Sequence, residues 1–81
     1  MSQQFHNQGF IIMIEQDAAE KDYTAYIPAL RLGAKGHTLE EVRDNARDLI
    51  LMEVEAMQKS GKSIPSDDNC IVETLSVSLT V

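Results

Sequence analysis

One segment of the chain carries both the start and the stop signals of a long α-helix. Thr38 and Glu41 have the spacing of a capping box, in which the threonine hydroxyl accepts a hydrogen bond from the Glu41 N–H and the glutamate reaches back. Gly61 suits the left-handed position that ends a helix, and Pro65 follows it. The sequence therefore predicts a helix from about Leu39 to Ser60, or about six turns, in a chain of only 81 residues.

The predicted helix has one apolar stripe and two apolar residues outside it. The stripe recurs at about 100° per residue and contains Leu39, Val42, Ala46, Leu49, Ile50 and Met57. Glu53 interrupts the stripe, whereas Leu51 and Met52 fall on other faces. Scattered surface apolar residues are common. The alternative is a homo-oligomer, a dimer or tetramer, with Leu51 and Met52 in its interface, because a small chain buries little core alone.

Strand signals lie on both sides of the helix. Phe10–Ile14 is apolar at every position, which favours a strand covered on both faces. Residues 23–27 favour a second strand that ends before Pro28, and their short polar connection to the first predicts an antiparallel hairpin. Residues 29–37 are either a loop or a short third strand. A final strand is predicted where apolar and polar residues alternate, at Leu75, Val77, Leu79 and Val81.

These elements predict a single α+β domain over residues 1–81, in which one helix covers one face of a small, mostly antiparallel sheet. Residues 1–8 are polar and are expected to be flexible. Lys and Arg number 7 and Asp and Glu number 13, so the formal net charge is −6. That balance disfavours nonspecific nucleic-acid binding and anionic membrane surfaces, since both need basic residues. With no signal-peptide pattern, the expected location is the cytoplasm.

No motif in the chain predicts catalysis, and we expect neither an enzyme nor a bound cofactor or metal. Gly61-Lys62-Ser63 follows a helix, whereas a phosphate-binding loop precedes one. His6 and His37 lack metal-ligand spacing, and the single cysteine, Cys70, excludes an internal disulfide and favours a small buried apolar residue. Glu53 and Glu73 would form a residual carboxylate site only if the fold brought them together.

The segment Tyr23-Thr24-Ala25-Tyr26-Ile27-Pro28-Ala29-Leu30, followed by Gly33, Gly36, Thr38-Leu39-Glu40-Glu41 and Asn45, resembles the HicB-like antitoxin family. The similarity covers about residues 9–66 and includes the glycine and proline after the helix. This chain departs from the family pattern at Arg31–Ala34, where Pro-Gly-Cys is frequent, and at Val42, where alanine is frequent. Many family members append a DNA-binding domain after this region; none is expected here, and direct DNA binding is therefore not expected.

The resemblance implies a β-β-β-α-β domain similar to a partial ribonuclease H fold without its catalytic acids, and it supports a third strand at Leu32–Lys35. It implies a partner, a small basic ribonuclease toxin of the HicA kind, which the antitoxin covers and inhibits. The predicted partner surface is the glycine-containing loop together with acidic residues of the helix start and of the hairpin. The residues named for it are Arg31, Leu32, Lys35, His37, Glu40, Glu41 and Asp44. The alternative is a stand-alone homo-oligomeric domain with no toxin.

Overall fold

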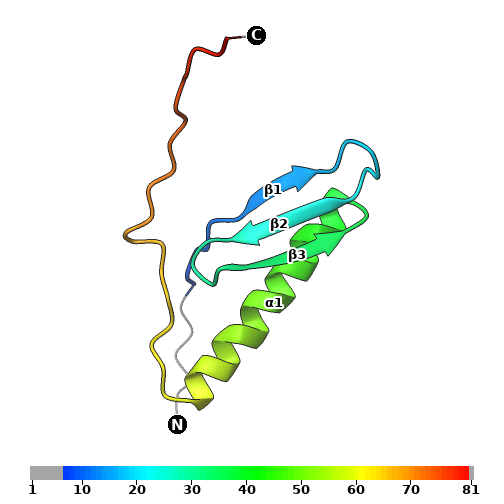
Figure 1. The fold of residues 1–81 in the computed structure, drawn as a ribbon. Coiled ribbons are helices and arrows are strands. Elements are labelled where there is room, and N and C mark those ends of the chain that lie inside the picture. Colours follow the sequence, from blue (N-terminus) through cyan, green and yellow to red (C-terminus); the bar gives the residue numbers. More distant parts are fainter. Residues whose placement is uncertain (1–6, 81) are drawn as a thin grey trace.

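The computed structural model describes residues 7–80 and contains three strands followed by one long helix (Figure 1). The strands are β1 (Met13–Gln16), β2 (Tyr23–Ile27) and β3 (Leu32–Gly36), and the helix is α1 (Leu39–Lys59). They form an antiparallel sheet in the order β1-β2-β3, with α1 packed on β2 and β3. The α+β class and the third strand are therefore confirmed. Of the predicted flexible segment, residues 1–6 and thus His6 lie outside the described residues, whereas Gln8 Nε2 donates to the Pro65 carbonyl at 2.8 Å.

The ends of α1 follow the local signals in the sequence. Thr38 Oγ1 accepts from the Glu41 N–H at 3.0 Å, and Glu41 Oε1 accepts from the backbone of His37, one residue before the cap. Ser60 forms the C-cap, and Gly61 follows with a φ of 71°, in the left-handed region that glycine adopts without a steric penalty. The helix prediction is confirmed to within one residue at its C-terminal end.

The core is small and lies between β2 and the first half of α1. Ala25 and Ile27 on β2 and Val42 and Ala46 on α1 are the buried apolar residues of the described chain. Gly36 makes their close contact possible, because a Cβ at this position would lie 2.6 Å from the Val42 backbone nitrogen. A side chain at residue 36 would therefore push the end of β3 away from the start of α1.

The first strand begins three residues later than the sequence predicts and ends two residues later. Met13 pairs with Tyr26 and Gln16 pairs with Tyr23, so this register places Ile12 opposite Ile27, the last residue of β2, and Ile11 opposite Pro28. Pro28, which follows β2, has no N–H for a sheet ladder. Phe10–Ile12 therefore precede β1 without pairing. The expectation of cover on both faces is also wrong, since the side chain of Met13 on β1 is 46% exposed.

The final strand of the predicted order is not formed in the described residues. Residues 71–80, here called the C-terminal tail, have no strand assignment, and all are exposed. The tail extends away from the domain, whereas the chain from Lys62 to Cys70 runs back past the N-terminal segment (Figure 1). The alternating pattern indicates a strand that needs a neighbouring strand, and residues 7–80 provide none along the tail. Val81 lies outside the described residues.

We expect Gly36→Ala to lower the free energy of unfolding by about 1–3 kcal/mol, because the added methyl group overpacks the contact with Val42. Urea denaturation followed by the helical circular dichroism signal measures the change. Gly9→Ala is the matched control, since a Cβ there meets no atom within 4 Å. Equal stability of the two variants would show that the Gly36 contact does not limit packing.

Candidate functional site

Acidic side chains gather where the β1–β2 connection meets the start of α1. Asp17 closes the connection: its carbonyl accepts from the Lys21 N–H at 2.8 Å, and its side chain accepts from the backbones of Ala19 and Glu20. Such a turn is typical of aspartate, whose side chain bonds to backbone groups just ahead in the chain. We call this region the acidic end and define it by Asp17, Glu20, Asp22, Glu40 and Glu41.

His37 links the two parts of the acidic end. Its Nδ1 lies 2.9 Å from Asp22 Oδ1, and its backbone N–H donates to Glu41 Oε1 at 3.3 Å. The hydrogen bond and the charge of Asp22, together with the charge of Glu41, raise the pKa of His37 above its usual value of 6.5. The ring itself is 80% exposed, so this contact is on the surface. It is accessible to a partner.

The predicted partner-binding residues do not form one patch. His37, Glu40 and Glu41 lie at the acidic end, and Asp44 follows on α1, where it pairs with Arg47 at 3.0 Å. Arg31 and Leu32 lie at the opposite end of β3 from His37, because residues 32–36 form an extended strand between them. Lys35 lies on that strand and bonds to α1 through its carbonyl, which accepts from Asn45 Nδ2 at 2.7 Å.

The sequence places acidic hairpin residues on the partner surface but does not single out Asp22 among them. The signal available was its place in a polar connection between two predicted strands. That signal does not identify His37, 15 residues further along the chain, as its neighbour. The contact between Asp22 and His37 follows from the sheet. The end of β1, the start of β2 and the end of β3 all lie at the same end of the sheet. Folding thus brings the turn between β1 and β2 into contact with the N-terminal cap of α1.

The proposed carboxylate pair is not assembled in residues 7–80. Glu53 lies half-buried on α1, whereas Glu73 lies on the exposed C-terminal tail, and no hydrogen bond joins them. No group of three or more His, Cys, Asp or Glu residues in the described part of the chain has a geometry that could hold a metal ion. Cys70 is half-buried, in contrast to the expected buried position. These positions provide no constellation for acid–base or metal chemistry.

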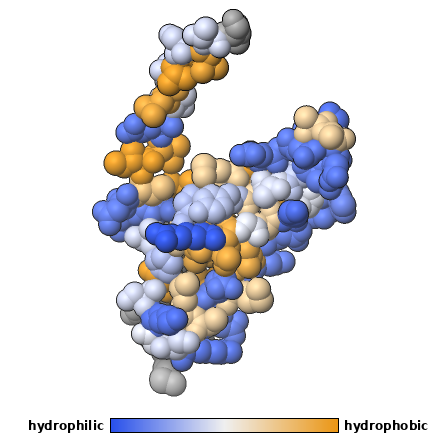
Figure 2. All heavy atoms as spheres, viewed as in Figure 1, coloured by the Kyte–Doolittle hydropathy of each residue, from blue (hydrophilic) through white to orange (hydrophobic). Residues whose placement is uncertain are grey.

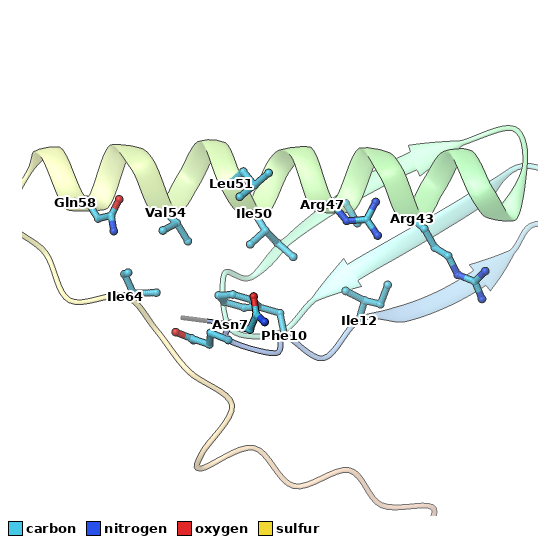
Figure 3. A pocket seen from close by; sticks show the side chains of 12 residues that line it. Asn7, Phe10, Ile12, Arg43, Arg47, Ile50, Leu51, Val54, Gln58 and Ile64 are labelled. Carbon is cyan, nitrogen blue, oxygen red and sulfur yellow. The ribbon is translucent and has the colours of Figure 1, made fainter. Parts of the chain in front are cut away.

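Two depressions flank α1, and they separate Leu51 from Met52. The first, here called the β1-side groove, lies between α1 and the segment before β1 (Figure 3). Its apolar lining includes Phe10, Ile12, Ile50, Leu51 and Val54, and its polar lining includes Arg43, Arg47 and Gln58. Met52 borders a shallower depression beside β3. Leu51 is 62% exposed and Met52 is 60% exposed. One flat interface would therefore not contain both residues centrally.

Comparison with protein-family models, curated proteins and solved structures finds no match to this chain. Within the described residues, no helix has the length and apolar character needed to cross a membrane. The similarity to the HicB-like family and to a partial ribonuclease H fold therefore remains a prediction from the sequence pattern.

We expect Asp22→Asn to lower the pKa of His37 toward 6.5, which NMR titration of the His37 ring measures. Because the folded-state pKa is raised, the contact stabilises the fold fully below about pH 6.5, the unfolded value, and this contribution is lost as pH rises through the folded pKa. Asp68→Asn is the control, because that side chain makes no described contact with His37. An unchanged pKa in Asp22→Asn would mean that the pair does not form in solution.

Proposed function

We propose that this chain is an antitoxin-type module that binds and inhibits a small basic ribonuclease toxin. The observation that carries the proposal is the resemblance of the segment Tyr23–Asn45 to the HicB-like family. The fold is compatible with it: Tyr23 begins β2, Pro28 follows that strand, Gly36 ends β3 and Asn45 ties α1 to β3. The resemblance extends over the part of the chain that builds the domain.

Inhibition by covering a toxin needs surface complementarity and no catalytic group. The chain has a net charge of −6, and the acidic end presents five carboxyl groups from two segments of the chain. A basic ribonuclease binds RNA phosphates, so a cluster of carboxylates can compete with RNA for the same basic surface. Complementary charge also speeds the encounter of two small proteins at low salt. Under this proposal the protein acts in the cytoplasm, where mRNA is the substrate it protects.

A stand-alone homo-oligomeric domain with no toxin is the second candidate. The high exposure of Leu51 and Met52 favours it, because large apolar side chains on a helix are suited to a subunit contact. The two candidates differ in their partner. Affinity capture from the native cell separates them: the first predicts a small basic protein in stoichiometric amount, and the second predicts the chain alone.

The captured protein provides the decisive assay. If it cleaves RNA, stoichiometric addition of this chain should stop the cleavage, and an excess should have no further effect. The activity is followed on a defined RNA by gel electrophoresis. An RNA-cleaving partner that remains fully active in the complex would contradict inhibition, and repeated recovery of the chain without a basic partner would favour the second candidate.

We expect Glu20→Lys combined with Glu40→Lys to weaken toxin binding by about tenfold or more and to reduce its salt dependence, since long-range attraction between opposite charges is lost. Calorimetry or surface plasmon resonance at several salt concentrations measures both effects. These two residues are chosen because Glu41 caps α1 and Asp44 pairs with Arg47, so their reversal would also affect stability.

The matched control is Asp48→Lys combined with Asp68→Lys, which changes the net charge equally away from the acidic end, at two carboxylates that form no ion pair within the described residues. Under the proposal this control retains most of the affinity. Equal weakening by both pairs would mean that only the overall charge matters, and an unchanged affinity in the first pair would remove the acidic end as the binding surface.

A further inference from the structure

The C-terminal tail combines an apolar stripe with nearly full exposure. Leu75 is 80% exposed, Val77 is 73% exposed and Leu79 is 79% exposed, although these residues alternate with serine and threonine as in a half-buried strand. Figure 2 shows the apolar residues of the tail standing clear of the rest of the molecule. The most exposed large apolar side chains of the described residues therefore lie on one extended segment.

The start of the tail is fixed beside the N-terminal segment. Asp67 Oδ2 accepts from the Ile11 N–H at 2.6 Å, and Gln8 bonds to the Pro65 carbonyl. A turn follows, in which the Cys70 N–H donates to the Asp67 carbonyl at 2.9 Å, and the chain then leaves the domain (Figure 1). The tail thus starts at a defined point and is directed away from its own sheet.

The composition of the tail is that of a paired strand. After Glu73 it contains no charge and no proline, and its residues are β-branched, serine or leucine. Native proteins protect unpaired strands with charges, prolines or covering elements, because free strands of this kind associate with other chains. None of these protections is present in residues 74–80. The main-chain groups of the tail are suited to pairing with a sheet edge, and its apolar side chains are suited to packing on an apolar surface.

The unpaired edge of β1 offers a sheet edge for the tail, and the β1-side groove offers an apolar surface. α1 packs on β2 and β3, so the helix-facing side of the sheet next to β1 is open. In Figure 3, Ile12 and Ile50 point toward each other across this opening, with Phe10 beside them. The other edge is less accessible, since the Asn45 side chain already bonds to the Lys35 carbonyl on β3. A strand added at β1 would extend the sheet and cover the groove.

We propose that the chain forms a two-fold dimer in which each C-terminal tail adds to the β1 edge of the other copy. Leu75, Val77 and Leu79 then fill the β1-side groove of that copy. At ~3.3 Å per residue, the ten-residue tail spans ~33 Å, which exceeds the ~23 Å of residues 10–16. Because the exchange is reciprocal, each tail pairs with one β1 edge and each β1 edge receives one tail. The assembly therefore stops at two copies.

The dimer predicts a sharp difference between the two faces of the tail. The wild-type chain should have twice the 9.0 kDa chain mass by light scattering, and Leu75→Asp combined with Val77→Asp should restore the monomer mass. Ser76→Asp combined with Ser78→Asp is the matched control and should remain a dimer. The helical circular dichroism signal verifies that each variant is folded. Equal behaviour of the two variants, or a monomeric wild type, would overturn the proposal.

A mixed sample of isotope-labelled and unlabelled full-length chains identifies the strand's neighbour. Isotope-filtered NMR should detect contacts from the Leu75 and Val77 methyl groups of one copy to Ile12 or Ile50 of the other. Contacts within one copy only would show that the tail folds back on its own sheet, and a dimer without tail contacts would place the interface elsewhere; both results overturn the exchange.

The helix residues give an independent comparison. Leu51→Glu, inside the groove, should dissociate the dimer, whereas Met52→Lys, beside β3, should leave its mass unchanged. Dissociation by Met52→Lys alone would contradict the exchange. None of these measurements involves a toxin, so their outcome is separate from that of the proposed function.

Discussion

The domain depends on the close approach of α1 to the end of β3. Gly36 permits this approach, because no side chain separates it from the Val42 backbone. The same approach brings Val42 and Ala46 onto Ala25 and Ile27, which form the fully buried core. It also places the helix start beside the β1–β2 connection, where the acidic end forms. The glycine at position 36 therefore allows the packing that positions both the core and the candidate site.

Local signals in the sequence were sufficient where the stabilising contacts are themselves local. The cap at Thr38, the end at Gly61 and the strand before Pro28 all depend on residues within a few positions of one another. The position of β1 depends instead on its register with β2, which an apolar run does not encode. The tail at residues 71–80 is the clearest case, since alternation specifies a strand and leaves its neighbour undetermined.

The candidate site shows the same division. His37, Glu40 and Glu41 were predicted because they surround a helix cap that the sequence defines. Asp22 was not, because its contact with His37 is created by the sheet order. Grouping Arg31 with these residues assumed a loop, and the five-residue strand β3 instead separates Arg31 from His37. A surface assembled from several elements requires the fold before its members can be grouped.

The small core and the exposed tail have one common explanation. Within residues 7–80, four apolar residues are buried, which is few for a chain with 43% hydrophobic residues. Several of the other apolar residues lie on the tail or line the β1-side groove. Burial of these residues between two copies would supply the apolar contact that one copy lacks. The exchanged strand would occupy the β1 edge and leave the helix start exposed. A dimer can therefore present two acidic ends to basic partners, and stabilisation of the fold and recognition need not compete for the same residues.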